Sequence, residues 1–539
     1  MLGVVGLASA ITSCEACGGT QVLAPEPTAS TPAIAAFAGP IEGTITFGAR
    51  PALHEGLGTD ENAMPARHVD LTLIDATGSP VASGQTDEEG RFAFAPTAGA
   101  VSLGITARVR VGAIDVSTSR VPDGAHSHAV VVPLEELASR GGRIHFADTD
   151  GEMAGALHIT DTLLRGSRAL ERWTGHALPP VFAYWGRGVT VEWSFFRGEI
   201  PAGSGRYCLE LLGGPLGEQS TTDTDEHDEG IILHELGHFV MNRLAGDSSI
   251  GGRHPPGALV DPGVAWEEGR ATWFAMAVLA EEQPDREVMY RDTVGIVPTG
   301  STRIDEDVER PSTPRGLGSE RSVAGVLWDL TDGDVADPRA VDAVDRDGDG
   351  VALGAARVLA AMSTAYDEPG SFVALPGFLR HLHRVQVISE TEIAAMLRAS
   401  GEDAALLPIS DESSPWPIEL ALATPTSGLV DGLSDPSPSG APAKPDNGID
   451  AVRVHRVVLD RAGTLVVTLA IEGTGTASDH TDLDLQLWTR RAEPMASAEG
   501  PLARHELRRA VEAGTYIVMV RDAGTGNRAR YTLEARLEP

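Results

Sequence analysis

The chain has 539 residues, more than one compact core usually needs, so about two to four domains are expected. Hydrophobic residues make up 42% of the chain, which excludes a protein that is disordered throughout. The 77 acidic residues outnumber the 42 lysine and arginine residues, giving a formal net charge of −35. Because this charge repels a phosphate backbone, nucleic acid is excluded as a partner.

The start of the chain has features of an export signal. An apolar run from Leu2 to Ile11 leads into the tetrad Ile11-Thr12-Ser13-Cys14, which resembles the lipobox of bacterial lipoproteins. The resemblance implies a lipid anchor at Cys14 and a protein outside the cytoplasm, either secreted or anchored on a bacterial outer membrane or cell surface. The alternative is a merely apolar start, because no lysine or arginine precedes the run.

Residues 1–37 are interpreted as this signal followed by a flexible tether rich in Gly, Thr, Ala and Pro. No apolar run reaches the roughly 18 to 20 residues needed to cross a bilayer, so any contact with a membrane is expected through Cys14 alone. Three cysteines, Cys14, Cys17 and Cys208, permit at most one disulfide.

Residues 38–137 alternate between apolar and polar positions in short segments such as 69–74 and 91–94, separated by Gly, Asp and Pro turns. This pattern predicts an all-β sandwich. The strand, the turn at 75–78 and the segment 86–92 resemble the carboxypeptidase regulatory-like family, which implies a small Ig-like accessory domain without catalytic residues.

Residues 138–409 change to helical periodicity, which predicts a separate α+β, mainly helical domain. Residues 154–173 are expected to form one amphipathic helix. The proline-rich stretch 410–447 is predicted to be a linker.

Alternation returns in residues 448–539, where a second β-sandwich is predicted. The steps at 462–465, 482–485 and 513–516 resemble the pre-peptidase C-terminal family, whose members are β-sandwich modules of secreted bacterial peptidases.

The segment from Asp228 to Gly246 predicts a helix that carries the sequence His234-Glu235-Leu236-Gly237-His238. Residues four apart lie on one face of a helix, so the imidazoles of His234 and His238 can bind one metal ion. Zinc accepts imidazole nitrogen, and this HExxH spacing is typical of zinc metallopeptidases. Glu235 is then the expected general base, acting on a water that the zinc activates.

A third ligand is expected in the helical run 264–275, which contains Glu267-Glu268-Gly269-Arg270-Ala271. This run resembles the glutamate-bearing helix of gluzincins, the thermolysin and aminopeptidase superfamily. The resemblance implies that Glu268 is the ligand, with Glu267 as the fallback, in a zincin-type metallopeptidase domain flanked by two all-β sandwiches.

The interval between His238 and Glu268, positions 239–267, is longer than in thermolysin and the large aminopeptidases, which predicts an inserted loop at 247–262. The third histidine of a metzincin is absent, because Leu244 stands at its position. Thr272 occupies the place where thermolysin relatives have an acid that orients a ligand.

Several other residues are candidates for a role in the site. The oxyanion of peptide hydrolysis needs a donor, and the domain offers five candidates that spacing does not rank: His254, Tyr290, Tyr366, His381 and His383. The acidic stretch 223–228 is interpreted as a helix cap and alternatively as a source of bonds to the metal ligands. The run 322–332 predicts a core helix near the site.

Asp345, Asp347 and Asp349 form the first half of a calcium-binding loop. Because Ala356 stands at the twelfth position, an EF-hand is excluded, and both a different Ca²⁺ site and a solvated acidic turn stay open.

The sequence therefore predicts an exported Zn²⁺-dependent peptidase that cleaves a protein or peptide substrate. The alternative is a surface adhesion or scaffold protein whose peptidase-like domain is inactive and binds a structural metal. An intact general base argues for the enzyme, because a structural zinc site has four protein ligands and no need of Glu235.

Overall fold

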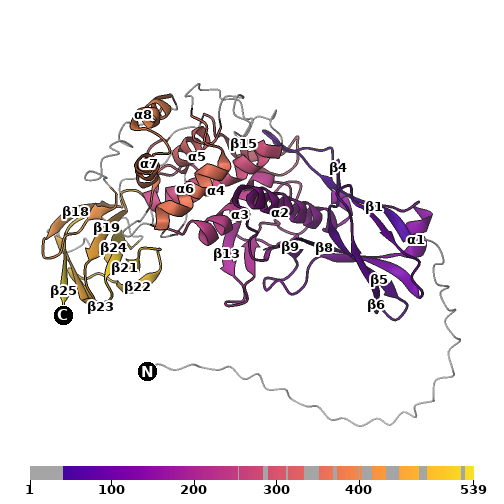
Figure 1. Ribbon diagram of the computed structural model, residues 1–539, viewed down its shortest axis with the longest axis horizontal. Helices are drawn as coiled ribbons and strands as arrows, with labels where there is room; N and C mark the ends of the chain where they lie inside the picture. Colours follow the sequence, from indigo (N-terminus) through magenta and orange to yellow (C-terminus); the bar gives the residue numbers. More distant parts are fainter. Residues whose placement is uncertain are drawn as a thin grey trace, which may run out of the picture.

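A computed structural model describes residues 41–249, 251–252, 254–282, 289–310, 314–332, 351–367, 373–399, 401–402, 416–432, 448–472, 482–523 and 528–539. The segment 1–37 with Cys14, and the calcium-loop candidates Asp345, Asp347 and Asp349, lie outside these residues. The described chain runs from N-terminal strands at one end of the molecule, through a central group of helices, to a C-terminal sandwich at the other end (Figure 1).

The N-terminal strands form two sheets that share a core. The smaller sheet has the order β11-β1-β4, with β7 also paired to β1. Its strands are β1 (Ile41–Ala49), β4 (Asn62–Pro65), β7 (Arg91–Phe94) and β11 (Arg143–Phe146), and a short hairpin of β2 (Ala52–Leu53) and β3 (Gly56–Leu57) follows β1. Alternate residues such as Ile45 and Phe47 are buried, as expected for strands with one face on a core.

The larger sheet has the order β13-β14-β12-β9-β8-β5-β6, with β10 paired to β8. Its strands are β5 (Val69–Asp75), β6 (Pro80–Gln85), β8 (Ala100–Val111), β9 (Ile114–Ser119), β10 (Ala129–Pro133), β12 (Val181–Tyr184), β13 (Phe195–Glu199) and β14 (Tyr207–Glu210). Helix α1 (Leu134–Ser139) follows β10.

This sheet crosses the predicted boundary between residues 137 and 138. Strand β12 pairs in parallel with β9, opposing Val181 to Val116, and β11 pairs in parallel with β1. The prediction of a self-contained sandwich over residues 38–137 is therefore wrong, because its two sheets are completed by strands from the next predicted domain. Strand pairing between distant segments leaves no local mark in the sequence.

The central region contains strands as well as the expected helices. Helix α2 (Met153–Thr174) confirms the predicted helix 154–173 and packs on β9, β1 and β8 on one side and on α3 on the other. The remaining elements are α3 (Glu229–Leu244), α4 (Pro262–Glu282), the hairpin β15 (Met289–Val294) and β16 (Ser301–Asp307), α5 (Glu320–Asp329), α6 (Ala355–Asp367), α7 (Leu375–Arg384) and α8 (Glu390–Ala399). Helix α5 accounts for the predicted run 322–332, and its buried residues confirm it as a core helix.

The C-terminal region is a sandwich of two sheets, with the strand orders β17-β19-β24-β21-β22 and β18-β25-β20-β23. The strands are β17 (Ile418–Glu419), β18 (Thr426–Asp431), β19 (Val452–Leu459), β20 (Gly463–Glu472), β21 (Leu483–Thr489), β22 (Pro494–Ala498), β23 (Arg504–Val511), β24 (Gly514–Asp522) and β25 (Arg528–Glu538). The predicted linker 410–447 is wrong for residues 416–432, because β17 and β18 belong to these sheets.

The C-terminal sandwich is docked on the central region. The outer face of its first sheet contributes Val452, Val454, Ile517 and Met519 to the central core, separately from the core between the two sheets. Polar contacts also join the two parts. The Trp416 indole N–H donates to Asp261 over 3.0 Å, the Ile449 N–H to the Leu259 carbonyl over 3.0 Å, and Arg490 to the Tyr366 carbonyl over 2.9 Å.

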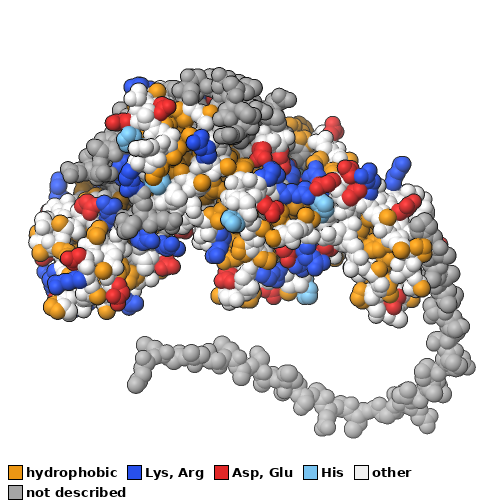
Figure 2. Space-filling view, viewed as in Figure 1, with side chains coloured by type: hydrophobic (Ala, Val, Ile, Leu, Met, Phe, Trp, Pro, Cys, Tyr) orange, Lys and Arg blue, Asp and Glu red, His pale blue; other side chains and the backbone are white. Residues whose placement is uncertain are grey.

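Acidic and basic side chains are interspersed over the face shown in Figure 2, so the negative charge does not form a single patch on that face. None of the helices in the described ranges has the length and apolar character required to span a membrane.

The C-terminal sandwich should lose stability in mild acid because of His455. This ring is fully buried, lies 2.8 Å from the Tyr531 hydroxyl, and has its pKa lowered to about 4 by burial. An unfolded histidine titrates near pH 6.5, so between about pH 6.5 and 4 the unfolded state binds more protons than the folded state. Stability contributed by the neutral ring is therefore present above that window and falls by about 1.4 kcal/mol per pH unit as the pH drops through it.

Calorimetry of the sandwich's unfolding transition at pH 7 and pH 5 measures this effect. His455→Gln removes the titrating group and is expected to show a smaller difference between the two pH values. An unchanged difference would assign the acid sensitivity to other groups.

Candidate metal centre

Helix α3 carries the histidine pair in a buried setting. Its first turn is tied to β15, because the Thr293 N–H and hydroxyl donate to the Asp228 carboxylate over 2.8 and 2.9 Å. The Asp228 side chain makes no cap bond to the helix itself, so the cap interpretation of residues 223–228 is wrong for this residue. At the other end Gly246 has a φ of +86°, the left-handed conformation that suits a helix C-terminus.

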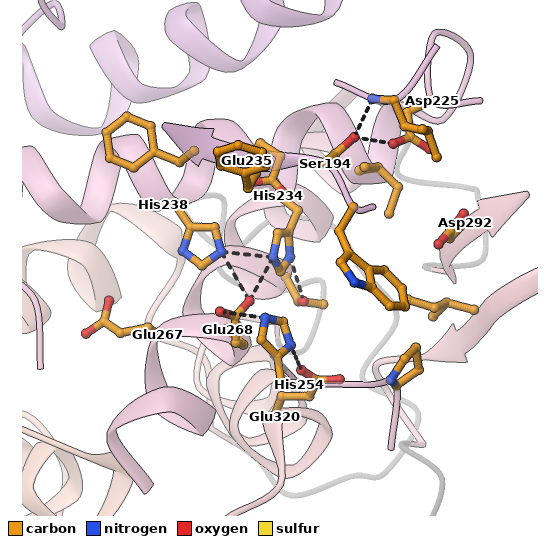
Figure 3. Close-up of a pocket in the computed structure, with 18 of the residues that line it drawn as sticks. Ser194, Asp225, His234, Glu235, His238, His254, Glu267, Glu268, Asp292 and Glu320 are labelled. Atoms are coloured by element: carbon orange, nitrogen blue, oxygen red, sulfur yellow. Dashed lines mark hydrogen bonds and ion pairs between the residues drawn. The ribbon is translucent and has the colours of Figure 1, made fainter. Parts of the chain in front are cut away.

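Helix α4 brings the predicted third ligand to the histidine pair. Glu268 Oε2 lies 3.2 Å from His234 Nε2 and 3.1 Å from His238 Nε2, and the two Nε2 atoms are 3.1 Å apart. Figure 3 shows the three side chains turned toward one point. A tetrahedral metal with bonds of about 2.0–2.1 Å separates its ligand atoms by about 3.4 Å, so this triangle fits one metal ion after a small relaxation.

Two glycines allow the helices to approach closely enough for this convergence. A Cβ added at Gly237 on α3 would lie 2.9 Å from Ala271 Cα on α4. On the other face of α4, a Cβ added at Gly269 would lie 2.4 Å from Val323 Cβ on α5. Both distances are shorter than atoms tolerate, so these positions of the HExxH and Glu-Gly-x-Ala segments require glycine for helix packing.

Glu267, the fallback ligand, is directed away from the triad (Figure 3). Its Oε1 accepts hydrogen bonds from the Ser248 N–H over 3.1 Å and from the Tyr366 hydroxyl over 3.0 Å, and its Oε2 pairs with the fully buried Arg270. These contacts hold the start of the loop between α3 and α4 and exclude Glu267 from the triad.

Two members of the triad, His234 and Glu268, each have a partner outside it that orients the side chain. His234 Nδ1 lies 3.0 Å from the Thr272 hydroxyl, which fixes the orientation of the imidazole. Glu268 Oε1 lies 3.1 Å from His254 Nε2, and His254 Nδ1 lies 3.5 Å from Glu320 Oε2. Glu320 was missed by the sequence reasoning, and the predicted loop 247–262 supplies His254.

The carboxylates around the triad favour a positive charge in it. Burial alone would lower the pKa of His238, but Glu268 raises it to about 9. Burial alone would raise the pKa of Glu268, but His254 and His238 hold it well below its usual range. A metal cation competes with the proton for this place, because histidine and glutamate bind metals in their deprotonated forms.

Glu235 lies beside the triad without belonging to it. Its side chain is buried, and its Oε2 has no hydrogen-bond partner among the described residues. Burial raises the pKa of Glu235, although His234 and His238 act in the opposite direction. A buried carboxylate with a raised pKa and an uncommitted oxygen is suited to proton transfer.

The structure separates the five oxyanion-donor candidates. Tyr290 and His254 line the pocket beside the triad, whereas Tyr366, His381 and His383 do not. The ring of Tyr290 stacks on His234 with centroids 5.6 Å apart, and burial raises the pKa of its hydroxyl, with Glu235 and Asp292 adding to the effect. Both nitrogens of His254 face carboxylates, which leaves Tyr290 as the stronger candidate of the two.

The triad opens into a cavity of about 570 Å³. Strand β13 and the loop before it form one wall, with Trp193, Phe195 and Phe196, and the hairpin of β15 and β16 forms another. Strand β13 is the edge strand of its sheet in the described part of the chain. With this volume, the cavity can hold a small segment of another molecule, and its walls carry both apolar and charged side chains.

A second buried group of metal-binding residue types, Asp148, Glu226 and His227, lies outside this cavity. Asp148 pairs with Arg50 over 2.8 Å and with Arg187 over 2.9 Å. Two arginines already neutralise Asp148, and His227 lies 3.2 Å from it, so Asp148 and His227 belong to a salt-bridge network of the core.

No protein-family model and no curated protein matches the chain. Among solved structures, the chain is similar to the pre-peptidase C-terminal domain of a collagenase from Bacillus anthracis, with 13% identity and a TM-score of 0.17 over 23% of this chain and 100% of that domain. It is also similar to PliG, a periplasmic lysozyme inhibitor from Aeromonas hydrophila, with 12% identity and a TM-score of 0.15 over 22% of this chain and 96% of that one. Similarities this weak carry no argument about function.

Thr272 should contribute to metal affinity through His234. Thr272→Val keeps the size of the side chain but removes the hydroxyl, so His234 loses the bond that fixes its orientation. We expect the affinity for Zn²⁺ to fall by about 10- to 100-fold, as measured by competition with a chromophoric chelator. Thr272→Ser keeps the hydroxyl and is expected to bind Zn²⁺ like the wild type. Equal affinities in all three proteins would show that the hydroxyl has no such role.

Proposed function

We propose that this protein is a zinc-dependent peptidase that acts outside the cytoplasm. The observation that carries the proposal is the convergence of His234, His238 and Glu268 on one point, with the uncommitted carboxylate of Glu235 beside it. Two imidazoles and one carboxylate are a donor set that zinc accepts in catalytic sites. The group has three donors among the described residues, whereas a structural zinc site would have four.

When bound, zinc would supply Lewis-acid activation of a water molecule and of the substrate carbonyl. Glu235 takes a proton from the attacking water and later delivers it to the leaving amine, for which its raised pKa is suitable. The Tyr290 hydroxyl donates a hydrogen bond to the oxyanion that develops on the carbonyl. His254 and Glu320 keep Glu268 oriented throughout.

The substrate is proposed to be a protein or peptide in an extended conformation. The edge strand β13 lies in the wall of the cavity, so an added strand can pair with its backbone while its side chains enter the cavity. The apolar run from Leu2 to Ile11 and the lipobox-like tetrad ending at Cys14 support a secreted or lipid-anchored location. The sequence steps at 462–465, 482–485 and 513–516, which resemble modules of secreted peptidases, favour the same location.

Glu235→Gln tests the proposed chemistry directly. The amide cannot accept the proton, so hydrolysis of casein is expected to fall by about 100- to 10,000-fold. Because Glu235 is not a ligand, the variant should retain about one equivalent of Zn²⁺ by metal analysis. Removal of zinc with a chelator should abolish wild-type activity, and added Zn²⁺ should restore it.

Glu171→Gln, which changes an exposed glutamate on α2, is the matched control and should retain full activity. Unchanged turnover in Glu235→Gln would refute the enzyme assignment. Loss of zinc together with activity would instead give Glu235 a role in binding the metal.

Tyr290→Phe tests the oxyanion donor. The ring and its stacking on His234 are kept, so substrate binding should change little, whereas kcat should fall by about 100- to 1,000-fold. Steady-state kinetics on a quenched peptide separate the two parameters. Tyr366→Phe, at a tyrosine that contacts Glu267 outside the triad, should leave kcat near the wild-type value. A larger effect from Tyr366 than from Tyr290 would contradict the assignment.

A further inference from the structure

We infer that the end of the cavity formed by Asp225, Asp292 and Trp193 is a subsite for a positively charged side chain, lysine or arginine, of the substrate. The inference rests on the proposed function and names the class of residue that the peptidase recognises beside the bond it cleaves.

The charges of the cavity wall are strongly unbalanced. Nine of the described side chains that line it are Asp or Glu, and one, Arg303, is arginine. Four of these acids, Glu235, Glu267, Glu268 and Glu320, belong to the metal centre and its immediate surroundings. The three aspartates at the other end, Asp223, Asp225 and Asp292, lie close enough together to share one cation. Figure 3 shows Asp225 and Asp292 on the side of the cavity away from Glu267.

Arg303 neutralises one of these aspartates. Its guanidinium pairs with Asp223 over 2.6 Å and lies farther from Asp292, at 3.9 Å. The side chain of Asp292 is 8% exposed, and its Oδ1 has no hydrogen-bond partner among the described residues. Asp225 accepts a hydrogen bond from the Ser194 hydroxyl. Asp292 therefore shares Arg303 with Asp223, and Asp225 has no cationic partner among the described residues.

This excess of negative charge is costly without a further cation. Burial raises the pKa of Asp292 to about 7, and Asp223 adds to the effect. Burial also raises the pKa of Asp225 well above its usual range, with further contributions from Asp292 and Asp223. A cation that enters from the cavity relieves this repulsion and forms charge-assisted hydrogen bonds with the carboxylates.

The subsite lies at a suitable distance from the proposed cleavage point. Asp292 and Tyr290 are two residues apart on β15 and both line the cavity, so they share a face at a spacing of about 6.6 Å along the strand. Tyr290 stacks on the metal ligand His234. Alternate side chains of an extended substrate have the same spacing, so a side chain close to the cleaved bond can reach Asp292.

The shape of the subsite also suits a long basic side chain. Lysine and arginine have apolar stems and charged ends, and Trp193 lines the same cavity as the carboxylates. The protein already uses this arrangement internally, because the Arg303 guanidinium lies 4.7 Å from the centre of the Trp193 ring while it pairs with Asp223. A divalent metal ion is less suited to the cluster, since the fixed positive charge of Arg303 would repel it.

The test uses the zinc-loaded full chain and a peptide library in which one position at a time carries Arg, Lys, norleucine or Glu. We expect the wild type to prefer Arg and Lys at one position. In Asp292→Asn and in Asp225→Asn, the ratio of kcat/KM for the basic peptides to kcat/KM for the norleucine peptide is expected to fall by about 10- to 100-fold. Asp247→Asn makes the same change of charge elsewhere in the cavity wall and is expected to keep the preference. No basic preference in the wild type, or an unchanged one in both variants, would overturn the inference.

Arg303→Gln acts in the opposite direction. It removes the internal partner of Asp223 and should increase the preference for basic residues. This variant keeps the inference testable if circular dichroism shows that an aspartate variant is unfolded. A decreased preference in Arg303→Gln would count against the subsite.

Binding separates this inference from the proposed function. N-acetyl-arginine amide is titrated calorimetrically into Glu235→Gln, with and without Asp292→Asn. If Glu235→Gln binds the arginine compound and the added Asp292→Asn change removes this binding, the result supports the subsite. If the wild type then cleaves no peptide, only the proposed peptidase activity is refuted. Saturable Ca²⁺ binding that depends on Asp292, without binding of the arginine compound, would assign the cluster to a divalent cation and overturn the inference.

Discussion

The close contact between α3 and α4 at Gly237 and Ala271 is the constraint on which the candidate metal centre depends. The histidine pair and Glu268 come from different helices, and three donor atoms about 3 Å apart tolerate little error in the distance between those helices. A side chain at Gly237 would push α4 away and carry Glu268 with it. Gly269 imposes the same restriction against α5, so α4 is held between two close neighbours. The geometry of the site thus depends on the glycines at positions 237 and 269 as much as on the triad itself.

The sequence predicted those parts of the molecule that have a local pattern. The spacing of His234 and His238 and the buried character of α3 follow from helical periodicity, and the Glu-Gly-x-Ala step identified Glu268. Most strands of the C-terminal sandwich were recognisable from alternation. Pairing between distant strands was not, which is why the sheet joining β9 to β12 crossed an expected domain boundary and why β18 was mistaken for part of a linker.

The surroundings of the triad were harder to predict for a related reason. Thr272 was identified as a departure from thermolysin relatives, yet its bond to His234 depends on how α3 and α4 face each other. Glu320 and Asp292 come from α5 and β15, which have no fixed spacing to the HExxH helix along the chain. The acidic stretch 223–228 was interpreted as charge at a helix start, but the side-chain hydrogen bonds of Asp228 go to β15 and not to its own helix. Charge near a helix is therefore a weaker guide than ligand spacing.

The attachment of the C-terminal sandwich has a consequence for how this architecture can evolve. Its contacts with Leu259 and Asp261 fall immediately before α4, the helix that supplies Glu268. Modules that are shuffled freely between genes usually join their hosts through linkers and small polar surfaces. Here the C-terminal sandwich shares a hydrophobic core with the central region and contacts the residues just before α4, the helix that carries Glu268. Gain or replacement of such a module would change the geometry of the candidate metal centre, so the two parts are expected to change together through evolution, as one inherited unit.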